Sequence, residues 1–125
     1  MITGIEHVAI ASHHPHDLAA WYVDTLGLTV SSRSETSQML RTPNGICLEV
    51  IQAEGNSLSA PQLRDQGLRH IALVVDDLAA TYALFKSRNV RFLSEPFLAG
   101  GNSVVFFTDP EGNFLHLIQR PVPLT

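Results

Sequence analysis

The chain has 125 residues and a formal charge of −4 at pH 7, and 45% of its residues are hydrophobic against 16% charged. This length suggests one domain, and the composition supplies a hydrophobic core and excludes a disordered chain. The basic residues form no run or stripe, which argues against nucleic-acid binding.

The sequence also predicts no signal peptide and no membrane-spanning segment. The first seven residues contain neither a basic segment nor a long apolar segment, so no signal peptide is expected. The apolar runs have the length of strands, which excludes a membrane-spanning helix. Cys47 is the only cysteine, so no internal disulfide can form, and a cytoplasmic location is predicted.

The first half of the chain predicts a strand, a helix and three further strands. Residues 5–11 read as a half-buried strand, with Glu6, Val8 and Ile10 on one face and His7, Ala9 and Ala11 on the other. A helix is expected from an N-cap at Asp17 to the C-terminal Gly27. Residues 28–35 and 37–41 predict a hairpin, and the turn at 43–45 leads into a buried strand over 46–52.

A linker over residues 53–67 is predicted from its Gly, Asn, Ser and Pro content, with a short helical turn at most. The pattern then restarts. A strand over 68–75 is followed by a helix capped at Asp77, a strand over 90–93, a loop over 94–102 and a strand over 103–108. A turn at 109–112 leads into the last strand, which contains His116.

Similar residues in the two halves indicate an internal repeat. His7 and His70 are offset by 70 − 7 = 63 positions, Asp17 and Asp77 by 77 − 17 = 60, and Glu49 and His116 by 116 − 49 = 67. Such small drifts are what loops of different length between equivalent elements produce. We therefore predict an α+β protein made of two tandem βαβββ modules, about 4–52 and about 68–120, within one domain, 1–125.

Four ionisable residues occupy first or last strands of the modules: His7, Glu49, His70 and His116. A carboxylate inside the apolar strand around Glu49 is costly to bury unless it meets a counter-charge or a metal. A single strand histidine is more often structural, but four matched positions favour a site. Three imidazoles and one carboxylate suit one divalent ion, Zn, Ni, Fe, Co or Mn. The other three histidines share a turn and are expected to be solvated: His13, His14 and His16.

The sequence resembles the vicinal oxygen chelate superfamily, which includes glyoxalase I, bleomycin-resistance proteins and extradiol dioxygenases. The motifs that carry the resemblance are Ile-Glu-His-Val-Ala-Ile at 5–10, Trp-Tyr-Val-Asp-Thr-Leu-Gly-Leu at 21–28, Leu-Arg-His-Ile-Ala-Leu-Val-Val at 68–75 and Phe-Thr-Asp-Pro-Glu-Gly-Asn at 107–113. They span nearly the whole chain. They are specific for the superfamily but do not identify the member.

The resemblance implies a cupped mixed sheet with the helices outside. It implies metal ligands at His7, Glu49, His70 and residue 116, and a homodimer whose sites are shared between chains. This chain carries His116 where the commonest pattern has glutamate. A neutral imidazole leaves such a site one negative charge short, which speaks against glyoxalase I itself.

The activity expected from these residues is that of a metal-dependent lyase or isomerase. Its small substrate, an α-oxo or α-hydroxy carbonyl compound, would be chelated through neighbouring oxygens. Glu49 is the expected catalytic base if it can leave the metal, and His116 is the alternative, while His7 and His70 serve as fixed ligands. Two further readings stay open, a non-haem Fe(II) dioxygenase and a metal-free ligand-binding or resistance protein.

Overall fold

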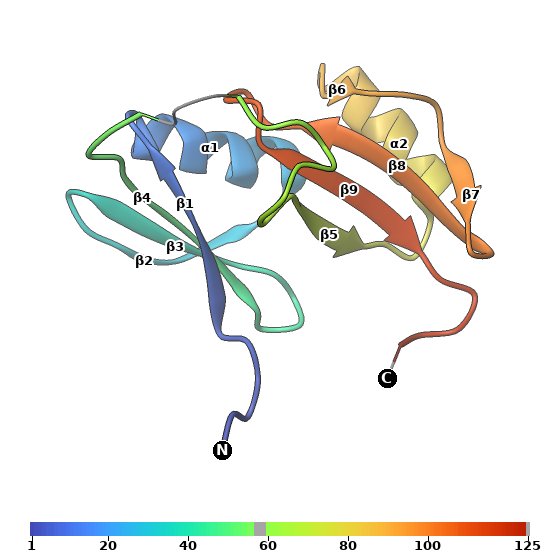
Figure 1. The fold of residues 1–125 in the computed structure, drawn as a ribbon, viewed down its shortest axis with the longest axis horizontal. Helices are drawn as coiled ribbons and strands as arrows, with labels where there is room; N and C mark the ends of the chain where they lie inside the picture. Colours follow the sequence, from blue (N-terminus) through green and yellow to red (C-terminus); the bar gives the residue numbers. More distant parts are fainter. Residues whose placement is uncertain (57–59, 125) are drawn as a thin grey trace. The chain divides into compact units, whose positions relative to one another are not determined.

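The computed structural model describes residues 1–56 and 60–124, which belong to two compact units, Met1–Leu58 and Ser59–Thr125. Each unit contains one helix and one mixed sheet, with four strands in the first sheet and five in the second (Figure 1). The predicted α+β class is confirmed. Residues 57–59 of the predicted linker lie outside the described residues.

The first unit follows the predicted βαβββ order. Its elements are β1 (His7–Ser12), α1 (Pro15–Leu26), β2 (Thr29–Arg33), β3 (Ser37–Arg41) and β4 (Cys47–Gln52). The strands lie in the order β1-β4-β3-β2. β1 and β4 are parallel, and the other neighbours are antiparallel. The first and last strands of the module are therefore adjacent, which brings His7 and Glu49 onto neighbouring strands.

Alternation along β4 separates the core of the first unit from its open face. Leu48 and Val50 are buried, and α1 packs against β3 and β4. Tyr22, on α1, is also fully buried. Glu49 lies between Leu48 and Val50 in sequence, so its side chain points to the opposite face of the sheet. The helix therefore stabilises one face by burying apolar area and leaves the other for polar groups.

Helix α1 begins earlier than predicted. His14 is the residue before the helix, Pro15 is in its first turn, and Asp17 lies inside that turn. Proline is favoured at this position because it has no N–H to satisfy and its φ angle is already helical. The expected N-cap role of Asp17 is therefore wrong. The C-terminal end is as predicted, since Gly27 adopts a left-handed conformation at φ 84°.

The second unit repeats the order and adds one strand. Its elements are β5 (His70–Val74), α2 (Leu78–Ser87), β6 (Arg91–Phe92), β7 (Phe97–Ala99), β8 (Asn102–Thr108) and β9 (Phe114–Gln119). The strands lie in the order β5-β9-β8-β6, and β7 pairs with β8. The side chain of Asp77 caps α2 by accepting from Ala80 N at 3.0 Å, as predicted.

Strand β7 corrects the prediction of an irregular loop over residues 94–102. Phe97 pairs with Val104, and Ala99 pairs with Asn102. Gly100 and Gly101 connect the strands with φ angles of 58° and 81°. Two consecutive residues with positive φ match the twist of a tight hairpin, and glycine adopts them without strain.

The core of the second unit lies between α2 and the sheet. Val105, Phe107, Leu115 and Leu117 are each at most 1% exposed, and α2 packs against β8 and β9. His116 lies between Leu115 and Leu117 and so points to the face away from α2. The two units thus build the same arrangement, a helix on one face and the predicted site residues on the other. The joining of the two sheets into one cup stays a prediction.

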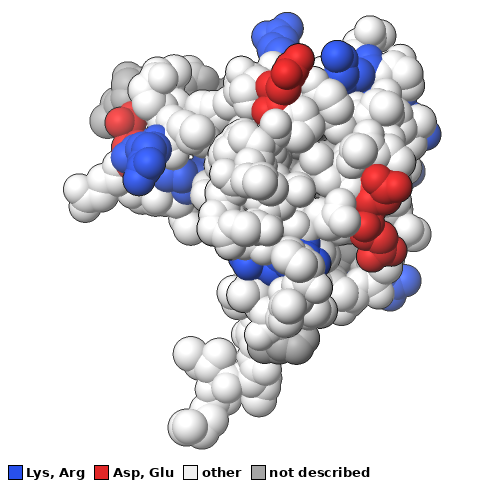
Figure 2. Space-filling model, turned by 90° about the vertical axis from the view of Figure 1, so that its right-hand side faces the viewer, with Lys and Arg blue, Asp and Glu red and all other residues white. Residues whose placement is uncertain are grey.

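Among the described residues, no helix combines the length and the apolar character needed to span a membrane. On the face drawn in Figure 2, Lys and Arg side chains lie in separate small groups, and Asp or Glu side chains lie beside some of them. This distribution agrees with the absence of a basic run in the sequence.

Candidate metal centre

The strand register places the predicted site residues at equivalent positions of the two units. In the first unit, His7 pairs with Cys47 and Ala9 with Glu49. In the second, His70 pairs with Phe114 and Ala72 with His116. Residues paired across a parallel ladder share a face, so each unit carries two potential ligands on one face. The repeat predicted from the sequence offsets is confirmed at the level of single residues.

In the first unit, the two potential ligands approach each other directly. His7 Nε2 lies 3.9 Å from Glu49 Oε1, and the side chains are 36% and 27% exposed. The other ring nitrogen of His7, Nδ1, donates a hydrogen bond to Glu6 Oε1 at 2.9 Å. The sequence did not single out Glu6. Its contact is visible only in the structure, because neighbouring residues of a regular strand point to opposite faces.

In the second unit, the two histidine rings meet edge to face. Their centroids are 4.6 Å apart, and the planes are inclined by 77°. His70 is exposed, whereas His116 is only 7% exposed. His116 Nδ1 donates to the carbonyl of Leu117 at 3.3 Å, which leaves Nε2 with its lone pair in the neutral ring.

The pKa of His116 is lowered from its ordinary value of 6.5. Desolvation is the largest cause, because a buried imidazolium loses its hydration, and the charge of His70 adds to it. Hydrogen bonding to the carbonyl of Leu117 acts in the opposite direction. His116 is therefore neutral at physiological pH, the form in which an imidazole can bind a metal ion.

An aromatic stack borders the histidines of the second unit. Phe106 stacks on its cross-strand neighbour His116 with a centroid distance of 4.7 Å, and Phe97 stacks on Phe106 with a centroid distance of 6.4 Å. Phe106 also meets the edge of His70 at 5.4 Å. Its equivalent in the first unit is Met39, which pairs with Glu49 in the same register. These neighbours were missed from the sequence because cross-strand register decides them.

The donor chemistry of these residues fits a divalent first-row ion, but one unit alone does not supply enough ligands. In a tetrahedral site, N and O ligands bound to such an ion lie about 3.4 Å apart. His7 Nε2 and Glu49 Oε1 are 3.9 Å apart, so they need to approach only slightly to bind the same ion. Within residues 1–56 and 60–124, no group of three or more His, Cys, Asp or Glu side chains is gathered in this way. Each unit therefore holds one pair of potential donors, fewer than such an ion needs.

The histidines of the 13–16 turn are exposed, as predicted, and two of them also form hydrogen bonds with other segments. His16 Nδ1 accepts from Gln38 Nε2 at 2.7 Å, and its Nε2 donates to the carbonyl of Glu35 at 2.9 Å. His13 Nε2 donates to Asn56 Oδ1 at 2.7 Å. These contacts connect the start of α1 with the β2–β3 turn and with the segment after β4. They assign His16 and His13 a structural role.

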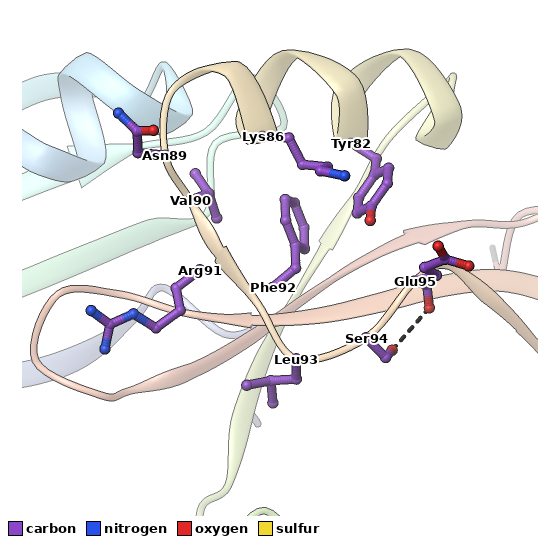
Figure 3. A pocket seen from close by; sticks show the side chains of 9 residues that line it. All are labelled: Tyr82, Lys86, Asn89, Val90, Arg91, Phe92, Leu93, Ser94 and Glu95. Carbon is purple, nitrogen blue, oxygen red and sulfur yellow. Dashed lines mark hydrogen bonds between the residues drawn. The ribbon is translucent and has the colours of Figure 1, made fainter.

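A hollow of about 610 Å³ lies elsewhere in the second unit. Tyr82 and Lys86 of α2 line one side of it, and the segment 89–95 lines the other (Figure 3). Lys86 Nζ lies 5.2 Å from the centre of the Tyr82 ring. None of the four predicted ligands lines this hollow, so it is separate from the predicted metal site.

Comparison with known proteins identifies the sequence relationship. The model of the "Glyoxalase/Bleomycin resistance protein/Dioxygenase superfamily" matches residues 4–117. The chain is 25% identical over 128 residues to the uncharacterized protein YwbC of Bacillus subtilis (strain 168), covering 96% of this chain and 100% of that one.

Two solved structures show the same fold. One is titled oxidase ChaP-H2, with a TM-score of 0.75 and 23% identity over 97% of this chain and 96% of the other. The second is a lactoylglutathione lyase from Agrobacterium tumefaciens, with a TM-score of 0.72 and 16% identity over 94% of each chain. At these identities the two likenesses establish the fold and leave the reaction open.

Proposed function

The chain belongs to the Glyoxalase/Bleomycin resistance protein/Dioxygenase superfamily, and we propose that it is a divalent-metal-dependent enzyme of the glyoxalase type. Its reaction would be that of a lyase or isomerase on a small substrate held through neighbouring oxygens. One observation supports this most: His7 with Glu49, and His70 with His116, occupy equivalent register positions on matching faces of the two units. Because its one cysteine is free, we propose that the protein is located in the cytoplasm.

The proposed ligands of one ion are the two pairs together, three imidazoles and one carboxylate. We propose that they meet in a homodimer, with His7 and Glu49 of one chain joining His70 and His116 of its partner. A mixing experiment separates this from a site within one chain. Glu49→Ala and His116→Ala chains are each expected to be inactive, but a mixed dimer with cross-chain sites has one intact site, so mixing restores about a quarter of the activity. A site within one chain stays inactive after mixing.

When bound, the ion supplies a positive charge that draws two substrate oxygens together and stabilises negative charge as it develops. Glu49 is the proposed base. Its side chain is 27% exposed, and Oε1 lies 3.9 Å from His7 Nε2, so the carboxylate is accessible to a substrate proton. Removing a proton next to a carbonyl requires a group within hydrogen-bond reach, which a carboxylate at the open face can provide.

His116 is the alternative proton acceptor. It is neutral at physiological pH, since burial lowers its pKa. Its ring is held between Phe106 and His70, and Nδ1 is bonded to the carbonyl of Leu117. These contacts fix the ring, which suits a ligand better than a group that must move with a proton. We therefore assign proton transfer to Glu49 and ion binding to His116.

A second candidate function is that of an Fe(II)-dependent oxygenase. Two histidines with one carboxylate form the ligand set typical of non-haem iron oxygenases, and this chain offers only Glu49 as a carboxylate in its proposed set. A relative of the same fold is titled an oxidase. The ion preferred by the protein distinguishes the two functions.

The test loads the metal-free protein with Zn²⁺, Ni²⁺, Co²⁺ or Fe²⁺ in separate samples. Each sample is then given a panel of small 2-oxo and 2-hydroxy carbonyl compounds in D₂O. Deuterium appearing by NMR at the carbon beside the carbonyl, lost in Glu49→Gln, supports the lyase or isomerase. Oxygen consumption only with Fe²⁺ supports the oxygenase. Neither activity with any ion, together with retained binding of panel compounds, would favour a ligand-binding protein.

A further inference from the structure

We infer that Glu6 is a positioning residue for the metal centre, and this inference rests on the proposed function. Glu6 holds His7 in the tautomer that has its hydrogen on Nδ1, so that the lone pair of Nε2 faces Glu49. The two ring nitrogens have separate neighbours: Nδ1 lies 2.9 Å from Glu6 Oε1, and Nε2 lies 3.9 Å from Glu49 Oε1.

The tautomer follows from the chemistry of the two contacts. An ionised carboxylate can only accept hydrogen bonds, so the short contact to Glu6 requires the hydrogen of the neutral ring to be on Nδ1. The longer contact to Glu49 needs no hydrogen. Nε2 then carries a lone pair beside a carboxylate oxygen, and this is the arrangement in which both atoms can bind one cation. A histidine ligand usually donates its second nitrogen in this way, which fixes its orientation.

The second unit lacks this contact, which makes it an internal control. Arg69 occupies the position equivalent to Glu6, since 69 − 6 = 63 is also the offset between His7 and His70. Arg69 Nη1 donates to the carbonyl of Gln62 at 3.4 Å. Its guanidinium has no acceptor to offer a histidine. His70 is instead held by ring contacts with Phe106 and His116. The two imidazoles of the repeat are therefore oriented by different means.

Solvent exposure of Glu6 limits how strongly it can affect metal affinity. The side chain of Glu6 is 86% exposed, so water competes for its oxygens. Residues that orient a metal ligand typically change metal affinity by about 10- to 100-fold, and a solvent-exposed one belongs at the lower end. We expect a loss of about tenfold in affinity for Glu6→Ala, and a smaller loss for Glu6→Gln, whose amide oxygen can still accept from Nδ1.

The experiment has two readouts on the full chain. The first is the ¹⁵N NMR shifts of the His7 ring in the metal-free protein, measured well above the ordinary imidazole pKa of about 6.5 and assigned with His7→Gln. The second is the affinity for Zn²⁺ alone, measured by competition with a coloured chelator. Glu54→Ala is the matched control, because it removes an exposed carboxylate of the same unit, whereas the ion pairs of His7 are with Glu6 and Glu49.

The expected result is hydrogen on Nδ1 in the wild type, Glu6→Gln and Glu54→Ala, and a shift toward hydrogen on Nε2 in Glu6→Ala with about tenfold weaker Zn²⁺ binding. A wild-type ring with hydrogen on Nε2, or equal Zn²⁺ affinity in wild type and Glu6→Ala, overturns the role of Glu6 and leaves the proposed function standing. A wild type that binds no Zn²⁺ overturns both.

Discussion

Replacing His116 with glutamate should reverse the pH dependence of stability in the metal-free protein. The wild-type imidazole has a lowered pKa because it is desolvated and lies beside His70. The folded state therefore binds its proton less readily than the unfolded chain. The stability that His116 contributes is fully present above about pH 6.5 and is lost as the pH falls through the lower pKa of the folded state.

A carboxylate in the same place behaves in the opposite way. At position 116 it would be only slightly exposed, next to the face of Phe106 and the carbonyl of Leu117, both of which repel an anion. Burial raises a carboxyl pKa, so its stabilising form is the protonated one, present below about pH 4.3 and lost as the pH rises through the raised value. At neutral pH we expect His116→Glu to cost about 1–3 kcal/mol, because the desolvation of the carboxylate outweighs its attraction to His70 and Arg120.

The assay is urea unfolding followed by circular dichroism between about pH 5 and pH 8, with His116→Gln as the reference that cannot titrate in this range. Subtracting the unfolding free energy of His116→Gln at each pH removes the contribution of all other titrating groups. Relative to it, the wild type should become more stable as the pH rises, and His116→Glu less stable. Two parallel curves, or a glutamate variant that gains stability with rising pH, would refute the reasoning about burial.

Three further substitutions test individual contacts. Phe106→Leu removes ring contacts to His116 and His70 and should lower the unfolding free energy by about 1–3 kcal/mol; no change in urea unfolding would show that the stack is not stabilising. His16→Ala leaves the 5%-exposed Gln38 without its partner, so it should cost about 1–3 kcal/mol while Zn²⁺ affinity stays unchanged, and weakened ion binding would contradict its structural role. Gly27→Ala strains a residue at φ 84° and should cost about 1 kcal/mol in thermal unfolding, whereas a more stable variant would be the opposite of this expectation.

The repeat could be predicted because similar local sequence patterns occur in both modules. Both modules have a histidine in the first strand and a Pro-containing turn before the last one. The offset of 67 between Glu49 and His116 also relates Met39 to Phe106, so it holds across two adjacent strands. Periodicity and turn residues are encoded within a few positions, which is why they are readable without a structure.

The extra strand could not be recognised from burial patterning. Phe97 and Leu98 are 44% and 76% exposed, so no apolar-polar alternation marks them. The signal available in the sequence is the Gly100-Gly101 pair, which is typical of a hairpin turn. The two-residue β6 was also shorter than the strand predicted over 90–93, because only Arg91 and Phe92 pair with β8.

The candidate site was predicted by residue but not by environment. Residue type and repeat position suggested His7, Glu49, His70 and His116. The contact of Glu6 with His7 depends on side-chain orientation at the start of a strand, and that of Phe106 with His116 depends on register. The bond between His16 and Gln38 joins residues 22 positions apart. Such contacts are decided by tertiary packing, which a local pattern does not contain.

We propose that one ion is bound by residues from both units. The most direct test of this proposal is elemental mass spectrometry on tag-free protein purified without chelator, comparing the wild type with Glu49→Ala and His70→Ala, one substitution in each unit. We predict about one ion per chain in the wild type and loss of the ion in both variants, as expected for a site that needs every ligand. Full metal content in His70→Ala, or a wild type that stays empty after reconstitution, would contradict the account.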